Sequence, residues 1–286
     1  MDSLLAHFRR LPLALLALCC LLTRLPAHAQ SQPTPLCIGQ TFTLASAVLS
    51  ETRRINIYLP AGYAENPALQ LPVLYMPDGG LAEDFLHVAG LVQVSVGNGT
   101  MRPFIVVGIE NTERRRDLTG PTTSAEDRKI APRMGGSAAF RQFIRTELMP
   151  AIRQRYRTNA ETAIVGESLA GLFVVETFLQ EPDLFDTYLA FDPSLWWNSS
   201  YLLGQADKRL PTYAGPAKTL YLAASSQPDI AAATRQLATT LRTVANPRIT
   251  WHYQPLPQET HATIYQPAAL QAFRTVFKPA AGSSGQ

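Results

Sequence analysis

Short apolar segments alternate along the chain with segments of helical periodicity. Strands buried on both faces have this composition, because helices cover each side of a parallel sheet. Six segments of this kind are predicted as strands: 72–76 (PVLYM), 104–109 (FIVVGI), 163–165, 187–191, 219–223 and 249–253. The alternation therefore predicts an α/β fold with a mostly parallel central sheet and helices on both faces.

The remaining segments fit around such a sheet. Residues 41–49 and 54–60 alternate polar and apolar side chains, which predicts an antiparallel edge hairpin. Residues 110–136 are polar and predict a loop. Helices are predicted at about 81–96, 137–156, 172–179, 229–244 and 263–277. No linker interrupts the middle of the chain, so we expect one domain over residues 37–278 and a flexible tail at 279–286.

The first 29 residues have the layout of a secretory signal. Arg9 and Arg10 precede the apolar run 11–22, and the stretch ends in Ala27-His28-Ala29. This run is shorter than the roughly 20 residues that a membrane-spanning helix needs. We therefore expect cleavage after Ala29 and a periplasmic or secreted protein, with no membrane span in the mature chain. An uncleaved N-terminal anchor is the alternative.

Charge and cysteine content narrow the function classes. The formal net charge is +3, and three arginines against one aspartate place +2 of it before residue 30. A nucleic-acid-binding domain usually carries a basic patch, so we expect no nucleic-acid partner. Of the three cysteines only Cys37 follows the signal segment, which excludes an internal disulfide in the mature chain. A packed core must therefore stabilise the domain.

The sharpest chemical signal is the segment 166–171 (GESLAG), which lies at a predicted strand-to-helix turn. Small residues two before and two after a serine permit the strained elbow that exposes a nucleophilic hydroxyl at the sheet edge. This chain has Ala170 where glycine is usual, which adds only a methyl group. Ser168 is therefore the candidate nucleophile, and the amide of Leu169 is a candidate oxyanion donor. A serine that only caps the helix is the alternative.

A serine hydroxyl needs a base, and three histidines follow the signal segment. His87 lies in a predicted helix far upstream of Ser168, and His252 lies inside the last predicted strand. His261 follows that strand in a loop, at the end of the sheet where Ser168 is expected. Elimination therefore favours His261 as the base.

The acid that orients the histidine is expected after the sixth or seventh strand. Asp192 directly follows the sixth strand, whereas the seventh strand has no carboxylate at its tip. We favour Asp192. Asp229, which also suits the first turn of a helix, and a Ser–His dyad without an acid remain alternatives.

Further residues are expected around the pocket. Gly80, next to Gly79 after the third strand, is the candidate second oxyanion donor. Trp196 and Trp197 follow the sixth strand and line the substrate pocket or pack in the core. Three consecutive arginines lie at 114–116, and Arg114 and Arg116 are candidate ligands of an anionic substrate group. A salt bridge to Glu110, Glu113 or Asp117, or simple solvation, is the alternative for these arginines.

Several stretches resemble the esterase D/enterochelin esterase-like family of α/β-hydrolases. They are LPVLYMPDGG, VVGIENTERRRDLTGP, AAFRQFIRTELMPAIRQRYRT, VGESLAGLF and DPSLWWN, together with the His261 loop, and they span about residues 40–275. The resemblance implies a single α/β-hydrolase domain, hydrolysis of carboxylic esters, and roles for Ser168 and His261 as nucleophile and base. In exported members it often implies siderophore trilactones as substrates. The family's acid after the seventh strand is often a Glu, which this chain lacks there.

Together these observations predict an exported serine esterase that acts on a small-molecule ester through an acyl-enzyme on Ser168. The scattered histidines and the single cysteine show no metal-ligand spacing, and no cofactor motif is present, so we expect neither metal nor cofactor. An acyltransferase with the same chemistry, and a ligand-binding protein on a hydrolase scaffold, are the alternatives.

Overall fold

The computed structural model describes residues 34–279, and the chain divides into the units Met1–Cys37 and Ile38–Gln286. The predicted signal segment 1–29 and residues 280–286 of the predicted tail lie outside the described residues. Residues 34–37 of the first unit contain no helix or strand.

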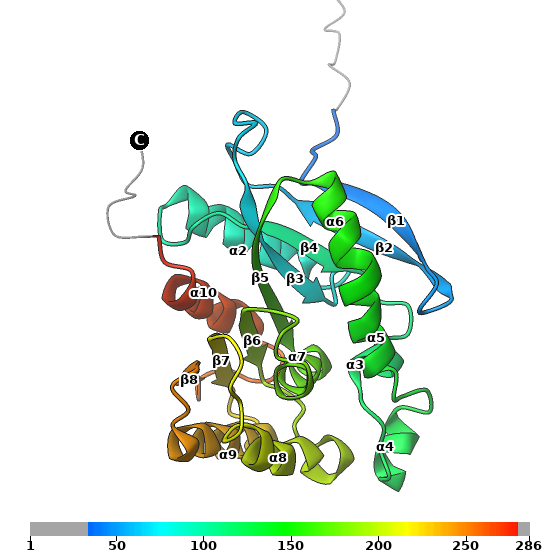
Figure 1. The fold of residues 1–286 in the computed structure, drawn as a ribbon, viewed down its shortest axis with the longest axis vertical. Coiled ribbons are helices and arrows are strands. Elements are labelled where there is room, and N and C mark those ends of the chain that lie inside the picture. Colours follow the sequence, from blue (N-terminus) through cyan, green and yellow to red (C-terminus); the bar gives the residue numbers. More distant parts are fainter. Residues whose placement is uncertain (1–33, 280–286) are drawn as a thin grey trace, which may run out of the picture. The chain divides into compact units, whose positions relative to one another are not determined.

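A single eight-stranded sheet runs through this unit in the order β1-β2-β4-β3-β5-β6-β7-β8 (Figure 1). β1 pairs with β2 and β2 with β4 in antiparallel fashion, and all other pairs are parallel. The strands are β1 Gln40–Ser46, β2 Glu51–Tyr58, β3 Leu71–Pro77, β4 Ile105–Ile109, β5 Thr158–Glu167, β6 Thr187–Phe191, β7 Lys218–Ala224 and β8 Ile249–Pro255. The predicted antiparallel hairpin and mostly parallel sheet are confirmed.

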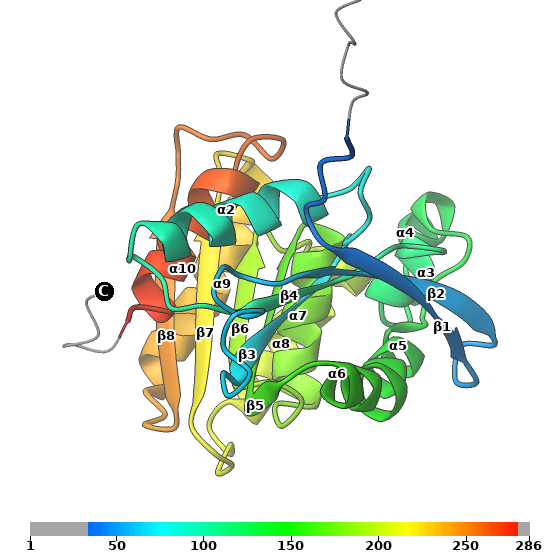
Figure 2. The ribbon, with the colours of Figure 1, turned by 90° about the horizontal axis from the view of Figure 1, so that it is seen from above.

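Helices cover both faces of the sheet (Figure 2). They are α2 Phe85–Gly97, α3 Arg114–Leu118, α4 Ala125–Ile130, α5 Ser137–Phe143, the π-helical segment η1 Ile144–Leu148, α6 Met149–Arg155, α7 Leu169–Gln180, α8 Trp197–Arg209, α9 Pro228–Val244 and α10 Tyr265–Val276. α2 and α10 pack together over one face, and α5 to α9 supply the core of the other. Within the described residues, no helix is long and apolar enough to cross a bilayer.

The sequence of β3 shows why this sheet needs two layers of helices. Successive side chains of a strand point to opposite faces. Val73 and Tyr75 accordingly belong to the core on the α7 side, while Leu74 and Met76 belong to the core on the α2 side. A strand that is apolar at every position therefore buries both of its faces.

Three helical predictions need correction. The loop expected at 110–136 contains the short helices α3 and α4. The helix expected at 137–156 is not a continuous α-helix, because it widens into a π-helical turn before Pro150. Proline has no backbone N–H to donate, and in a regular α-helix its ring would collide with the carbonyl four residues earlier. α8 has no counterpart in the prediction.

Candidate active site

The elbow between β5 and α7 holds Ser168 in a strained backbone conformation. Its φ is +60° and its ψ is −119°, values that a residue with a side chain rarely adopts. The neighbouring small residues permit the turn. A Cβ on Gly166 would lie 2.7 Å from Ala170, and one on Gly171 would lie 2.9 Å from the carbonyl oxygen of Phe191. The methyl group of Ala170 itself is accommodated, as the sequence suggested.

A chain of hydrogen bonds leads from Ser168 to a buried aspartate. The hydroxyl of Ser168 lies 3.0 Å from Nε2 of His261, and Nδ1 of His261 lies 3.0 Å from Oδ2 of Asp192. His261 stands in the turn after β8 with 38% of its side chain exposed, whereas Asp192, at the tip of β6, is fully buried. The hydrogen bond to Asp192 is the main cause that raises the pKa of His261 above its ordinary value of 6.5.

Asp192 is itself fixed from the neighbouring strand. Its Oδ1 accepts a hydrogen bond from the amide of Ser225 at 2.6 Å, and its Oδ2 accepts one from the Ser225 hydroxyl at 2.5 Å. Ser225 directly follows β7, so the two adjacent strand ends meet here. Ser225 could not be predicted as this partner, because nothing in the segment ASSQPD indicates which hydroxyl faces the aspartate.

The other candidates for acid and base lie elsewhere. Asp229 is exposed in the first turn of α9, where its carboxylate accepts a hydrogen bond from the side chain of Gln227. His87 contacts Asp84 at 3.0 Å within the α2 region, and His252 lies within β8. The structure therefore brings Ser168, His261 and Asp192 together, and not the alternatives.

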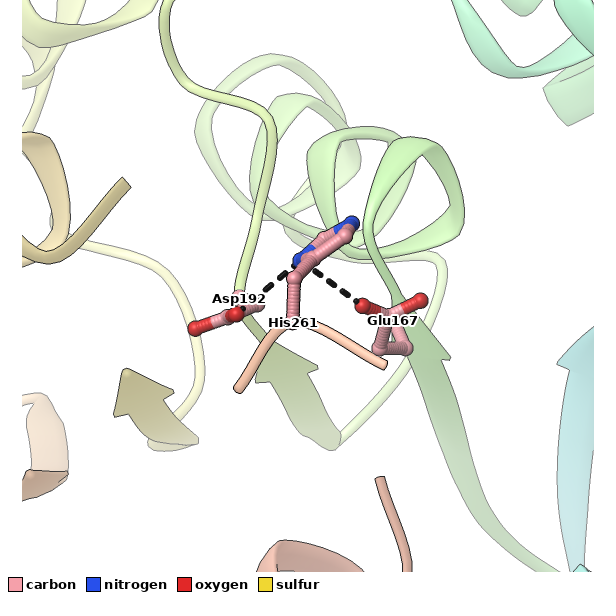
Figure 3. Close-up of side chains that lie close together, drawn as sticks. All are labelled: Glu167, Asp192 and His261. Carbon is pink, nitrogen blue, oxygen red and sulfur yellow. Dashed lines mark hydrogen bonds and ion pairs between the residues drawn. The ribbon is translucent and has the colours of Figure 1, made fainter. Parts of the chain in front are cut away.

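A second carboxyl group lies beside the same histidine (Figure 3). Oε1 of Glu167 is 3.2 Å from Nδ1 of His261, on the side not taken by Asp192. Burial is the main cause that raises the pKa of Glu167 to about 8. Among residues 34–279 these three side chains are the one group of potential metal ligands, with their ligand atoms within 4.8 Å of one another. A metal ion there would have to displace the Nδ1 hydrogen that bonds Asp192.

The two candidate oxyanion donors differ in their surroundings. Leu169 is the first residue of α7, so its amide has no acceptor within the helix. The amide of Gly80 donates instead to Oε2 of Glu83 at 2.6 Å, and that of Gly79 donates to the carbonyl of Ile109. Gly80 therefore becomes available to a substrate only when the Glu83 carboxylate moves away.

Arg114 forms a two-pronged ion pair with Asp78, with its Nε and a terminal nitrogen 2.7 and 2.8 Å from the two carboxylate oxygens. Asp78 follows β3, next to the glycines of the candidate oxyanion loop. The positive charge of Arg114 also opposes the rise in the pKa of Glu167, so it lies within electrostatic reach of the site.

Arg116 has a different environment, since it bonds Asp117 at 2.7 Å and Glu51 at 2.7 Å. The salt bridge to Asp117 is one of the alternatives considered from the sequence. Arg115 donates to the carbonyl of Ile130. Of the three arginines, Arg114 is the one paired with a residue of the candidate oxyanion loop.

A pocket of about 350 Å³ lies between α5, α7, α8 and the loop at 120–123. Its wall begins one helical turn from the serine, because the amide of Leu172 donates to the carbonyl of Ser168. Trp197 lines it with its ring nitrogen bonded to the carbonyl of Gly120 at 2.9 Å, while Trp196 packs, partly buried, against the core. The inner wall carries the buried pair Arg141 and Glu176, 3.1 Å apart.

A comparison with known protein families identifies the family of the chain. The family model described as "Putative esterase" matches residues 46–260. The chain belongs to this esterase family. The match confirms the resemblance drawn from the sequence motifs.

Relatives of this esterase family give the same picture. The chain is 30% identical over 178 residues to the ferri-bacillibactin esterase BesA of Bacillus subtilis, which covers 55% of this chain and 60% of that protein. It is 25% identical over 164 residues to the iron(III) salmochelin esterase of Escherichia coli, with 56% of this chain and 36% of that protein covered. It thus spans under two thirds of either relative.

A solved structure covers more of both chains. The IroE-like serine hydrolase from Shewanella oneidensis superposes with a TM-score of 0.77 at 31% identity, over 84% of this chain and 80% of that one. The predicted α/β-hydrolase fold class is confirmed.

Proposed function

We propose that the chain is a serine carboxyl-ester hydrolase that works through an acyl-enzyme on Ser168. The observation that carries the proposal is the hydrogen-bonded series of Ser168, His261 and Asp192, in which each group has the distance and order that nucleophilic catalysis requires. Membership of the esterase family supports the same reaction class.

In the first half-reaction His261 takes the hydroxyl proton of Ser168 on Nε2 while the serine oxygen bonds to the ester carbonyl carbon. Asp192 holds the Nδ1 hydrogen and stabilises the imidazolium that forms. The amides of Leu169 and Gly80 donate to the tetrahedral oxyanion, and Gly80 does so after releasing Glu83. The imidazolium then gives its Nε2 proton to the departing alkoxide, which leaves the acyl group on Ser168.

In the second half-reaction the same base activates water. His261 removes a proton from the water as its oxygen attacks the acyl carbon, and returns that proton to the serine oxygen when the carbon–oxygen bond breaks. The products are a carboxylic acid and the regenerated hydroxyl. No step requires a group beyond these residues and water.

Siderophore-type esters are the substrate class that we propose. Two relatives are named as esterases of ferri-bacillibactin and of iron(III) salmochelin. The pocket of about 350 Å³, whose lining residue Leu172 lies one helical turn from Ser168, gives room for one arm of such a molecule, and its aromatic wall at Trp197 suits a flat ring. Arg114 is proposed to face an acidic group of the substrate. A signal segment at 1–29 would direct the enzyme to the periplasm or the outside of the cell, where it could bind siderophores.

Hydrolysis of p-nitrophenyl esters from acetate to octanoate by the full chain and by Ser168→Ala tests the reaction class. The proposal expects turnover by the wild type that falls at least about 10³-fold in the variant. A trilactone siderophore, with and without Fe(III), then tests the substrate class through ring opening to its linear hydrolysis products. Equal turnover in both proteins would overturn the role of Ser168, and ester turnover without any siderophore cleavage would overturn the substrate proposal.

A further inference from the structure

Glu167 has no place in the series Ser168–His261–Asp192, yet it lies against the central ring of that series (Figure 3). It is the last residue of β5, directly before Ser168. Its Oε1 lies 3.2 Å from Nδ1 of His261, almost as near as Oδ2 of Asp192 at 3.0 Å. Two carboxyl groups thus converge on one ring nitrogen.

The two carboxyl groups are not equivalent. Nδ1 carries one hydrogen, and its hydrogen bond goes to Asp192, which Ser225 also holds in place. Oε1 of Glu167 is buried and has no hydrogen-bond partner among residues 34–279, and only 16% of the side chain is exposed. A buried carboxyl oxygen without a donor is unfavourable. Its contact with His261 is therefore no hydrogen bond, and it becomes an attraction between opposite charges when Glu167 is ionised and the ring is protonated.

We propose that Glu167 is a positioning residue for His261, a second carboxyl group whose charge sets how strongly the imidazole holds a proton. The proposal rests on the proposed serine-esterase function, in which this ring is the base. When the proton of Ser168 reaches Nε2, the ring becomes positive, and an ionised Glu167 at 3.2 Å stabilises that charge in addition to Asp192. No proton passes to Glu167, because the Nδ1 hydrogen stays on its bond to Asp192.

The surroundings of Glu167 make its charge adjustable near neutral pH. Burial and the neighbouring Asp192 raise the pKa of Glu167, while His261 and Arg114 oppose the rise, with a result of about 8. Glu167 and His261 therefore titrate as a coupled pair, each favouring the charged form of the other. The charged and titratable groups facing Glu167 are His261, Asp192, Arg114, Asp84 and Tyr265.

The direct test is an NMR titration of the His261 ring in the full chain, with wild type beside Glu167→Gln. Glutamine has the same shape but no charge. The proposal expects the wild-type ring to titrate in two coupled steps, and the variant ring in one step with a midpoint lower by about one pH unit. Glu167→Asp, which keeps the charge, should retain the two steps. Identical titrations in wild type and Glu167→Gln would overturn the proposal.

Asp84→Asn is the matched control. Asp84 faces Glu167 electrostatically but contacts His87 rather than His261, so its removal should leave the His261 titration in two steps. An equal shift from Asp84→Asn and Glu167→Gln would show a general charge effect and contradict a specific role for Glu167.

The pH profile of ester hydrolysis separates this proposal from the one on which it rests. Its acid limb in kcat/KM should move to lower pH in Glu167→Gln, by about the same amount as the ring titration, whereas a merely structural role would lower kcat/KM equally at every pH. Hydrolysis that depends on Ser168 with an unmoved limb would reject Glu167 and keep the esterase. A shifted ring titration without any ester hydrolysis would reject the esterase and keep the coupling.

Discussion

The backbone amide of Gly80 donates a hydrogen bond to Oε2 of Glu83 at 2.6 Å. Oε1 of Glu83 in turn accepts from the side chain of Asn111 at 3.0 Å. The residue proposed as the second oxyanion donor is thus occupied by a carboxylate of its own chain. A substrate oxyanion must therefore displace the negatively charged Glu83 carboxylate from the Gly80 amide.

Breaking the hydrogen bond between Gly80 and Glu83 should therefore cost free energy, and this cost reduces the net stabilisation of the transition state. A hydrogen bond to a charged group contributes about 1.5–3 kcal/mol. We expect Glu83→Ala to raise kcat/KM by about tenfold or more in steady-state hydrolysis of a p-nitrophenyl ester. Glu83→Gln, which keeps an acceptor without the charge, should give a smaller rise. A tenfold fall in Glu83→Ala would show instead that Glu83 is needed to hold the Asn111 loop.

Asp192 is predicted to act as the acid, and its loss should be severe. Asp192→Asn keeps the size of the side chain but removes the charge that stabilises the imidazolium and fixes its tautomer. We expect kcat/KM to fall by about 10⁴-fold. Asp229→Asn, at the exposed start of α9, is the control and should change kcat/KM by less than about twofold. Comparable losses in both variants would contradict the assignment.

Much of this arrangement could be predicted from the chain alone. The apolar strands predicted the sheet, and the glycines around Ser168 predicted the elbow. Chain order limited the acid to the ends of β6 and β7. The lack of a carboxylate at the tip of β7 favoured Asp192, but the sequence did not show that Ser225, across a strand boundary, holds this aspartate in place.

Features formed by short-range folding of polar segments escaped prediction. α8 begins at Trp197, and the next three residues, Asn198, Ser199 and Ser200, have positive φ near 50–60°, so its start shows neither a helical pattern nor an apolar stripe. The hydrogen bond between Gly80 and Glu83 joins residues three apart in the sequence, and hydrophobic periodicity does not predict such a contact. Glu167 is visible in the GESLAG motif, but its approach to His261 requires the β8–α10 turn to be placed first.

The pH dependence should follow the protonation of His261. Its pKa is raised above 6.5, chiefly by the hydrogen bond to Asp192, and only the neutral ring can accept the proton of Ser168. Activity should therefore be lost as the pH falls through that raised pKa. We expect kcat/KM, measured from about pH 5 to 9, to show an acid limb above 6.5. Full activity at pH 5.5 would be inconsistent with His261 as the base.

The pocket beside Leu172 should determine which acyl or alcohol groups are accepted. Ala138, exposed on α5 at the wall of this pocket, can be replaced without disturbing the core. We expect Ala138→Trp to raise KM for the octanoate ester at least fivefold relative to the acetate. Gln142→Trp, at an exposed position of α5 that does not line the pocket, is the control and should leave that ratio unchanged. An unchanged ratio in Ala138→Trp would exclude this pocket as the substrate site.

The proposed mechanism requires a covalent bond between the substrate and Ser168, and this bond can be trapped. The full chain and Ser168→Ala would each be treated with a fluorophosphonate, which reacts with activated serines, and the adduct located by peptide mass spectrometry. We expect one phosphonyl group on Ser168 in the wild type and none in the variant. An unlabelled wild type that still hydrolyses esters, or a label on another residue, would contradict it.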